Sequence, residues 1–393
     1  MKKQQSIVMM LVMMVFIGFG IIIPVLPAIV EEQGNGHLHL GLMLALYSAA
    51  SFVMAPFWGS LSDRIGRRPV ILLGLVGFTA GFLIFALADD RLWMMYASRI
   101  IGGLFSGAVA SCAVAYIADI TDEDNRTKGM GLIGMSIGLG FLIGPPIGGV
   151  LSLVGHYVPF FASAGVTFLL FLFALRGLPE SLPIDQRRTQ HEQKESRLTA
   201  FKGSLKYLYL LSFFVSFTLA GLESTFQFFQ MERLGVTPFQ VSLMFFLSGI
   251  VGAGIQGGVV RKRVKKGDEP KAIAIGLVLS AIGFALILFS SNWLTAAIFM
   301  SVFAAGNSLI RPCVLSLITQ KSVVRHGVST GLNTSMDSLG RIAGPILFSS
   351  ILYGIRIELP FLVGAFVSVA ALWLLIRFVS HVRSVQPPHS ADL

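Results

Sequence analysis

Charged side chains are scarce in this sequence of 393 residues. Asp, Glu, Lys and Arg together make up 13% of the chain, whereas hydrophobic residues make up 54%. A soluble domain carries roughly 25% charged residues. The deficit excludes an ordinary water-facing surface and indicates that most of the exterior faces lipid.

Cysteine and histidine are also few, and neither forms a chemical motif. The two cysteines, Cys112 and Cys313, both lie inside apolar runs, which excludes a disulfide framework. The seven histidines fall in predicted loops or tails without metal-ligand spacing. The chain also has no nucleophile elbow, phosphate-binding glycine loop or paired-carboxylate motif. We therefore expect a protein that is not an enzyme and that needs no metal or cofactor.

Long apolar runs are what the sequence has in abundance. A membrane-spanning helix needs about 20 apolar residues, and hydropathy predicts twelve such spans. They cover residues 6–30, 40–61, 69–88, 92–118, 129–153, 157–175, 205–230, 238–260, 271–290, 292–318, 328–353 and 358–378. The fold class predicted from this layout is an all-α membrane protein.

One long polar stretch divides the spans into two sets of six. We predict an N-terminal six-helix bundle over 1–176, a linker over 177–204 and a C-terminal six-helix bundle over 205–393. A membrane receptor or enzyme that transports nothing would need a soluble sensory or catalytic segment. This linker is too short for one, which counts against that class.

The formal net charge of +10 gathers on one side of the predicted membrane. Of the 30 lysines and arginines, 24 fall in the two termini, the linker and the loops on the same side as the termini. The loops on the other side hold only Arg91, Arg233 and Arg356. Such a bias places both termini in the cytoplasm. It also assigns the charge to the membrane surface and not to nucleic acid.

The two halves repeat one another at an offset of 200 residues. Gly140 and the pair Gly144-Pro145 recur as Gly340 and Gly344-Pro345. Parallel half-repeats related by an axis along the membrane normal are typical of one class of secondary transporter. The repeat predicts a substrate path between the halves, near the middle of the membrane.

The segment Gly59-Ser60-Leu61-Ser62-Asp63-Arg64-Ile65-Gly66-Arg67-Arg68-Pro69 is a dense charged cluster between apolar runs. It resembles the loop between the second and third helices of major facilitator superfamily transporters. The resemblance implies a gating role for six residues. They are Gly59, Asp63, Arg64, Gly66, Arg67 and Arg68. It further implies that Asp63 approaches the start of span 11 when the carrier faces outward. The alternative is a charge cluster that only sets topology.

Span 5 carries a second signature, with glycines at 131 and 140 followed by Gly144-Pro145 and Gly148-Gly149. This pattern resembles that of bacterial drug:proton antiporters with twelve transmembrane helices, including multidrug and tetracycline exporters. The resemblance implies that the bend limits leak, with gating residues Gly140, Gly144, Pro145, Gly148 and Gly149. Tight helix packing alone is the alternative, and both can hold because small residues let helices approach closely.

The second half departs from the family pattern in two places. The 258–270 segment is basic and has lost the aspartate–arginine–glycine order of the first-half loop. Exporters of this kind often carry an acidic residue in span 10 before an Arg-Pro step. Here Asn307 precedes Arg311-Pro312, so that acidic site does not carry over.

Five charges fall well inside the predicted spans, away from their ends: Arg99, Glu223, Arg311, Asp337 and Arg341. Each costs roughly 2.5–3.5 kcal/mol at mid-membrane even on the most lenient scale. One interpretation is structural, with arginines paired to carboxylates. Asp337 and Arg341 are four residues apart on one helical face, which predicts such a pair, and Asn333 extends the same polar stripe.

Glu223 has a different setting, because no basic residue lies on its helix between Lys206 and Arg233. It belongs to a stripe with Ser216, Gln227 and Gln230, among many phenylalanines. Burial favours the neutral carboxyl, which could carry a proton and could attract a cation when ionised. The alternative is a plain helix–helix hydrogen bond. The family resemblance carries an acidic residue of span 7 onto this position.

Together these features predict a secondary transporter that works by alternating access and exports lipophilic, cationic or zwitterionic drugs in exchange for protons. The residues predicted for proton coupling are Glu223, Asp337, Arg99 and Arg311. Those predicted for substrate binding are Glu223, Gln227, Phe226, Asn307, Arg311 and Asn333. The predicted setting is the bacterial cytoplasmic membrane, with a small lipophilic molecule, protons and lipids as partners and a monomeric carrier. The alternative is a carrier of a specific anionic metabolite or lipid-linked compound.

Overall fold

The computed structural model describes residues 2–31, 36–121, 123–184, 187, 203–264, 267–321 and 326–385. Over these residues it is helical and contains no β-strand, so the predicted all-α fold is confirmed. The helices are α1 (Lys2–Ile22), α2 (Leu26–Glu31), α3 (Gly36–Ile65), α4 (Arg67–Ala86), α5 (Leu92–Asp119), α6 (Glu123–Ser152), α7 (Val158–Gly177), α9 (Leu205–Leu234), α10 (Pro238–Gly254), the π-helix η2 (Ile255–Val260), α11 (Arg261–Arg263), α12 (Glu269–Ile287), α13 (Trp293–Lys321), α14 (His326–Gly354) and α15 (Leu359–Val385).

The chain divides into two compact units. Unit 1 comprises residues 1–192 and 235–246, and unit 2 comprises 193–234 and 247–393. The first boundary falls inside the predicted linker, while the start of α10 groups with unit 1.

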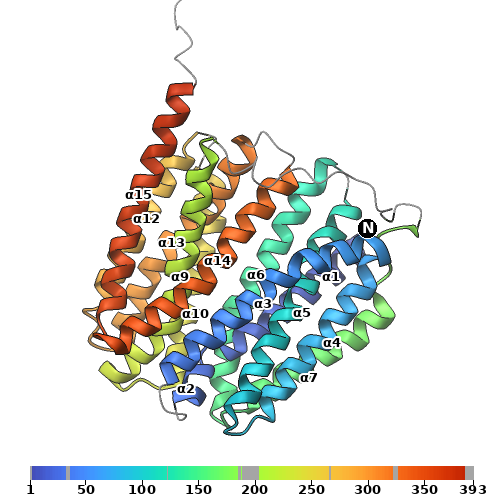
Figure 1. Cartoon of the computed structure of the whole chain (residues 1–393), viewed down its shortest axis with the longest axis horizontal. Coiled ribbons are helices and arrows are strands. Elements are labelled where there is room, and N and C mark those ends of the chain that lie inside the picture. Colours follow the sequence, from blue (N-terminus) through green and yellow to red (C-terminus); the bar gives the residue numbers. More distant parts are fainter. Residues whose placement is uncertain are drawn as a thin grey trace, which may run out of the picture. The chain divides into compact units, whose positions relative to one another are not determined.

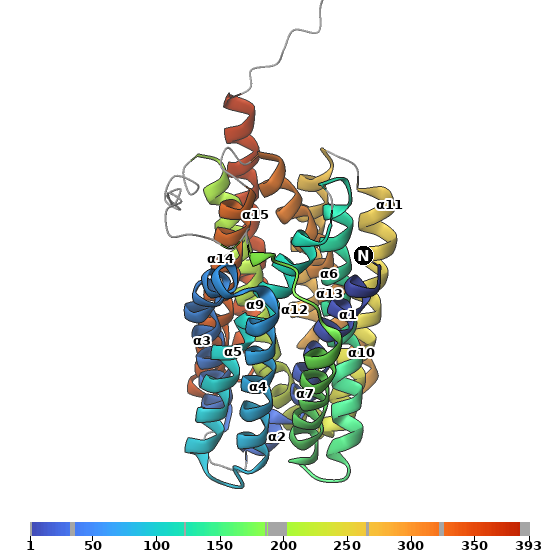
Figure 2. The same cartoon turned by 90° about the vertical axis from the view of Figure 1, so that its right-hand side faces the viewer.

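In unit 1, α5 packs against both α3 and α4, and α4 in turn packs against α7 (Figure 2). Glycines permit this close approach. A Cβ on Gly74 of α4 would lie 2.7 Å from Val109 of α5, and one on Gly107 of α5 would lie 3.1 Å from Ala55 of α3. Because lipid gives helices no hydrophobic drive to associate, such close van der Waals contact is the main source of cohesion.

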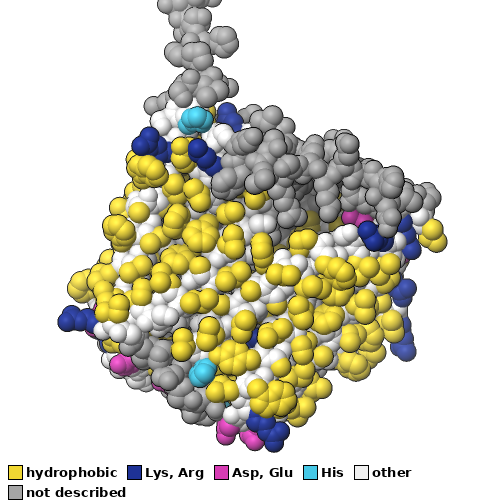
Figure 3. All heavy atoms as spheres, viewed as in Figure 1, with side chains coloured by type: hydrophobic (Ala, Val, Ile, Leu, Met, Phe, Trp, Pro, Cys, Tyr) yellow, Lys and Arg dark blue, Asp and Glu magenta, His cyan; other side chains and the backbone are white. Residues whose placement is uncertain are grey.

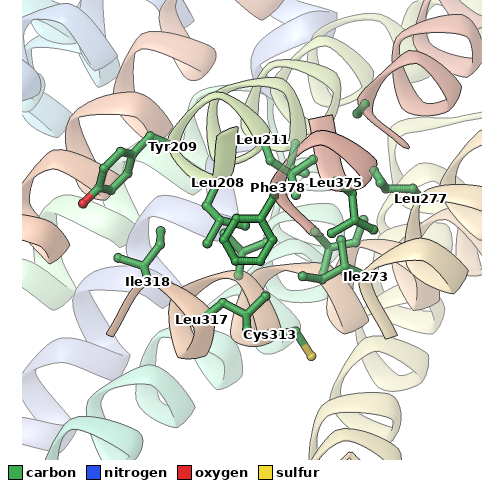
Figure 4. Close-up of a cluster of buried hydrophobic side chains, with 14 of the residues drawn as sticks. Leu208, Tyr209, Leu211, Ile273, Leu277, Cys313, Leu317, Ile318, Leu375 and Phe378 are labelled. Carbon is green, nitrogen blue, oxygen red and sulfur yellow. The ribbon is translucent and has the colours of Figure 1, made fainter. Parts of the chain in front are cut away.

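In unit 2, α9 lies against α13, α14 and α15 (Figure 1). A cluster of buried side chains joins α9, α12, α13 and α15, and Figure 4 shows ten of them labelled. Leu208 and Leu211 of α9 contribute to it, with Ile273 of α12, Leu317 of α13 and Phe378 of α15. The α14 side of α9 carries both apolar contacts, such as Phe217 with Phe348, and the polar contacts described below.

Eleven helices among the described residues are long and apolar enough to cross a membrane. Predicted span 11 corresponds to α14, which is 29 residues long but is not among those eleven. At about 1.5 Å per residue it still reaches across a bilayer, and its polar side chains face α9, as described below. On the face shown in Figure 3, hydrophobic side chains cover the helix surfaces and charged ones lie mainly near helix ends. Large hydrophobic side chains are exposed on the helices, such as Phe366 and Trp373 of α15 at 73% and 55%.

Candidate transport site and gating network

The centre of the candidate site is Ser216 of α9, which connects two residues of opposite charge. Its hydroxyl donates a hydrogen bond to Asp337 Oδ1 at 2.7 Å and accepts one from Arg311 Nη2 at 3.0 Å. Ser216 itself is fully buried. Two residues predicted for proton coupling, Asp337 and Arg311, are therefore joined through one serine that the sequence placed in a polar stripe.

A second link extends this polar chain along the interface of α9 and α14. Ser212 donates to Asn333 Oδ1 at 2.6 Å, and Asn333 Nδ2 lies 3.5 Å from Asp337 Oδ2. The residue numbers on the two helices rise together, so the helices run in the same direction. Asn333 is thus attached to Asp337, as its spacing of four residues predicted.

Two glycines of α14 bring its backbone against α9. A Cβ on Gly340 would lie 2.7 Å from the Phe217 nitrogen, and one on Gly344 would lie 3.0 Å from the Gly221 nitrogen. Larger residues would push the helices apart and break the hydrogen bonds of Ser216. These glycines therefore set the register of the polar chain.

Glu223 pairs with Arg341 across the same interface. Glu223 Oε2 lies 3.6 Å from Arg341 Nη1, with 25% and 29% of their side-chain surfaces exposed. The expected pair of Asp337 with Arg341 is therefore wrong for the ion pairs of the described residues. Four-residue spacing identifies neighbours on one helix only, whereas the register of α9 against α14 brings Glu223 nearer. The neighbouring helix also supplies the opposite charge that α9 itself lacks.

The remaining residues predicted for substrate binding lie outside this polar chain. Phe226 and Gln227 are buried, with 0% and 2% of their surfaces exposed. Gln227 Nε2 contacts Met231 Sδ at 3.6 Å. Asn307 lines a cavity of about 10 Å³ together with Thr218, Ser280 and Ser368, which is room for about one water molecule. Asn307 therefore lies beside α9 at a small cavity and outside the hydrogen bonds that join Ser216, Asp337 and Arg311.

Arg99, the remaining residue predicted for proton coupling, belongs to unit 1 and is buried. Its guanidinium lies 5.1 Å from the ring centre of Phe85 and 5.9 Å from that of Phe160. These two rings stack on one another at 3.9 Å. Arg99 Nη2 also donates to Ser98 Oγ at 3.2 Å. Its described contacts are thus aromatic faces and a hydroxyl, whereas the structural interpretation expected a carboxylate.

We call residues 59–69 the α3–α4 junction. The helices continue through it so that Gly66 is the only residue between them. Arg67 is its centre: Nη1 lies 2.5 Å from Asp63 Oδ1 and donates to Ser62 Oγ at 2.6 Å, and Nε donates to Asp119 Oδ2 at 3.1 Å. The structure thus brings Asp63 and Arg67 together, as the motif suggested, and adds Asp119 from the end of α5.

The other junction residues have different surroundings. Arg64 is exposed, and Arg68 Nη2 donates to the Leu175 carbonyl at 2.6 Å. A Cβ on Gly59 would meet nothing within 4 Å. Gly59 is therefore not required by close packing.

The span-5 signature lies in α6, where three of its glycines face α1. A Cβ on Gly140 would lie 2.8 Å from the Met13 carbonyl, one on Gly144 would lie 2.7 Å from the Gly20 Cα, and one on Gly148 would collide with the Ile21 carbonyl. Gly149 faces Ser242 at the start of α10 instead. Pro145 lies inside α6 against Gly20. This geometry accounts for the glycines by close helix packing, and a role in limiting leak stays a prediction.

Comparison with known proteins identifies the family. The model of the Major Facilitator Superfamily matches residues 8–322 and 265–392. The chain belongs to the Major Facilitator Superfamily. It is 31% identical over 382 residues to multidrug resistance protein 2 of Bacillus subtilis, covering 95% of each chain. It is 26% identical over 393 residues to the quinolone resistance protein NorA of Staphylococcus aureus, covering 97% of this chain and 98% of the relative.

Solved structures of other facilitators share the fold. The human organic anion transporter MFSD10 has a TM-score of 0.73 at 26% identity, covering 95% of this chain and 99% of that one. The nucleoside transporter NupG has a TM-score of 0.78 at 15% identity, with the same coverage. This facilitator is accordingly a multi-pass membrane transporter and not an enzyme, as the sequence analysis predicted.

Sequence reasoning missed two functional candidates in this facilitator, Asp119 and Glu180, which contact the α3–α4 junction. It named Arg341 but did not pair it with Glu223. Asp119 ends an apolar span and Glu180 lies between Pro179 and Pro183. A carboxylate at the end of a span next to a basic junction was the available signal, but sequence alone does not show which helix ends meet.

Proposed function

We propose that this facilitator exports lipophilic, cationic or zwitterionic drugs in exchange for protons, by alternating access. The proposed setting is the bacterial cytoplasmic membrane with both termini in the cytoplasm, where the carrier acts as a monomer among lipids. The proposed division remains a bundle over 1–176, a linker over 177–204 and a bundle over 205–393.

The relatives support a drug as the substrate. Two bacterial proteins similar over nearly the whole chain are named for multidrug resistance and for quinolone resistance. The similarity covers both units, so it includes the polar interface of α9 and α14.

The observation that carries the proposal is the long, partly exposed ion pair of Glu223 and Arg341. A quarter of the Glu223 side chain is exposed, and its partner is 3.6 Å away instead of at hydrogen-bonding distance. The long contact leaves no short charge-assisted hydrogen bond for a competitor to break. A proton or a cationic ligand therefore competes with Arg341 for the carboxylate.

Exchange follows from this competition in the proposed cycle. A proton on Glu223 removes the negative charge that attracts both Arg341 and a cationic drug. Loss of the proton restores that attraction, so one carboxylate serves the drug or the proton but not both. One charge crossing 100 mV supplies about 2.3 kcal/mol, which corresponds to a concentration ratio of about 50.

We propose a supporting role for the other polar residues. Protonation of Asp337 would change the charge felt by Arg311 through Ser216, and Arg99 would assist proton movement from unit 1. Asn333 and Arg311 would contact the drug beside Glu223. Phe226, Gln227 and Asn307 are buried, so their contact with a drug requires the surroundings of α9 to rearrange.

The test compares two carboxylates of the same helix. Purified carrier in liposomes is given an imposed proton gradient, and efflux of ethidium and luminal pH are recorded together. Glu223→Gln should reduce ethidium-coupled proton movement at least tenfold. Glu232→Gln changes an exposed residue of α9 and should leave it within twofold of wild type. Full coupling in Glu223→Gln would contradict the proposal.

An anionic substrate is the second candidate, and the arginines favour it. Arg311 and Arg341 both lie at the α9 interface, and the structurally similar MFSD10 is described as an organic anion transporter. This candidate would be a specific anionic metabolite or a lipid-linked compound. Saturable binding of one anion, with no binding of ethidium or tetraphenylphosphonium, would favour it. Cation binding that Glu223→Gln abolishes would favour the drug.

A further inference from the structure

The chain segment that follows α7 is docked on the α3–α4 junction. Leu178 and Leu182 are buried, with 2% and 8% of their surfaces exposed. Between them, the Pro179 carbonyl accepts a hydrogen bond of 2.8 Å from the Tyr116 hydroxyl of α5. We call residues 178–182 the strap. Its two leucines and one backbone contact fix its path across unit 1.

Glu180 is the centre of the strap and caps a helix distant in sequence. Its Oε1 accepts a hydrogen bond from the Arg67 backbone nitrogen at 2.8 Å, and its Oε2 accepts one from Arg68 at 3.2 Å. These N–H groups belong to the first turn of α4, which has no partners inside the helix. The cap position, Gly66, makes no side-chain cap hydrogen bond. The strap therefore supplies the cap that the junction lacks.

The same carboxylate also shapes the strap. Oε1 accepts hydrogen bonds from the backbone nitrogens of Ser181 at 3.0 Å and Leu182 at 3.1 Å. One side chain thus ties two backbone segments together. If Glu180 is released, backbone N–H groups at the start of α4 and in the strap lose the carboxylate that accepts their hydrogen bonds.

Gly66 is shaped to admit this carboxylate. Its φ of 106° and ψ of 162° fall in a region that is essentially limited to glycine. A Cβ at this position would also collide with Glu180 Oε2 and lie 2.7 Å from its Cδ. Both the backbone conformation and the space therefore require glycine where the strap meets the junction.

The strap and the ion pairs of the junction share an atom. Asp119 Oδ2 accepts a hydrogen bond of 2.9 Å from Ser181 Oγ and one of 3.1 Å from Arg67 Nε. Movement of Arg67 away from Asp119 therefore disturbs the strap, and movement of the strap disturbs Arg67. The end of α3, the start of α4, the end of α5 and the segment after α7 form one connected unit.

We propose that Glu180 is a positioning residue that locks the α3–α4 junction, and that undocking of the strap is a step of the transport cycle. The strap opens the predicted linker between the two halves, so a rearrangement of Asp63, Arg67 and Asp119 is transmitted to the linker through Glu180. The cycle itself rests on the proposed function, whereas the lock can be tested without transport.

The two native cysteines provide that test. Cys112 of α5 is buried and contacts Ser62, a partner of Arg67. Cys313 is buried in unit 2. In the full-length carrier, Glu180→Gln should raise the rate of N-ethylmaleimide labelling at Cys112 at least fivefold and leave Cys313 within twofold, both measured by mass spectrometry. General unfolding would raise both rates together and would overturn the proposal, as would an unchanged rate at Cys112.

A control variant lies in the same segment. Ile184 follows the strap and is 81% exposed, so Ile184→Ala should leave Cys112 labelling as in wild type. An equal increase in this variant would contradict the assignment to Glu180. In liposomes, Glu180→Gln should lower the maximal export rate at least threefold with the apparent KM within twofold. Unchanged export despite fast Cys112 labelling would overturn the coupling to transport. Absence of drug export in wild type would instead refute the proposed function and leave the labelling result decisive for the lock.

Discussion

The starts of α4 and α12 correspond in the two half-repeats but are stabilised differently. Both follow a glycine of similar backbone conformation, with φ of 106° at Gly66 and 101° at Gly267. At α4, a cation from the helix and carboxylates from three other segments form a shared network. At α12, buried Glu269 accepts hydrogen bonds from Gly267 at 2.6 Å and from Gln320 of α13 at 2.8 Å.

The two helix starts differ in whether their charged residue has alternative ionic partners. Arg67 has two alternative carboxylates, so its ion pairs can be redistributed between partners. In the described contacts, Glu269 accepts hydrogen bonds only from neutral groups, which are the Gly267 backbone nitrogen and the side chains of Ser316 and Gln320 on α13. The repeat therefore keeps a glycine of positive φ before both helices but not the ionic contacts around it. We propose that the first half, whose arginine has alternative partners, takes the changing role.

The largest effect is expected from removing the cation of the first junction. Arg67→Met leaves Asp63 and Asp119 facing one another without the charge that both contact. Breaking a buried pair costs about 3–5 kcal/mol, and partial exposure of the carboxylates reduces this to about 2–4 kcal/mol. Denaturant titration in mixed micelles measures the free energy of unfolding. A loss under 1 kcal/mol would remove the distinction between the junctions.

Substituting the glycine before each helix gives a matched pair of variants, for which we expect an effect of intermediate size on stability. Gly66→Ala and Gly267→Ala share the strain of a positive φ, but only the Gly66 variant would displace a carboxylate, since a Cβ on Gly267 meets nothing within 4 Å. Gly66→Ala should therefore cost about 1–2 kcal/mol more, the usual worth of a helix cap. Thermal unfolding of both variants under the same conditions gives the comparison. Equal melting temperatures would show that Glu180 does not act as the cap.

The smallest effect is expected at the second junction. Glu269→Gln keeps the shape but loses the charge that strengthens its hydrogen bonds, at a cost of about 1 kcal/mol, with export within twofold of wild type. Lys271→Ala is the control, because the Lys271–Asp268 pair is long, at 3.8 Å, and exposed and should contribute nothing measurable. Loss of export in Glu269→Gln would indicate that the second junction also moves.

The helical fold was predictable because each apolar run is long enough to identify a span by itself. One predicted span is instructive: α14 carries Asn333, Asp337 and Arg341, and it is not among the eleven helices that are long and apolar enough to cross a membrane. Their hydrogen bonds and ion pair to α9 explain why a span tolerates them. Spacing correctly indicated that these residues share one face.

Contacts between residues on different helices could not be predicted from the sequence. Arg341 pairs with Glu223 because Gly340 and Gly344 set how α14 lies on α9, and no local pattern records that register. Glu180 meets a helix whose first residue is 113 positions earlier in the chain. Arg99 lies against stacked rings from α4 and α7, a setting that its own helix does not reveal.

Ser216 has a single hydroxyl hydrogen, and this fact limits what its two neighbours can do. While Asp337 is negative, that hydrogen points to the carboxylate and the serine lone pairs are left for Arg311. A neutral Asp337 carries a hydrogen of its own and no longer needs the one from serine, so the hydroxyl is free to rotate and withdraw its lone pair from the guanidinium. We propose that protonation of Asp337 thereby reaches the Arg311 guanidinium on a third helix through rotation of one O–H bond. Ser216→Thr keeps this hydroxyl, whereas Ser216→Ala leaves Asp337 and Arg311 without a shared hydrogen-bonding partner.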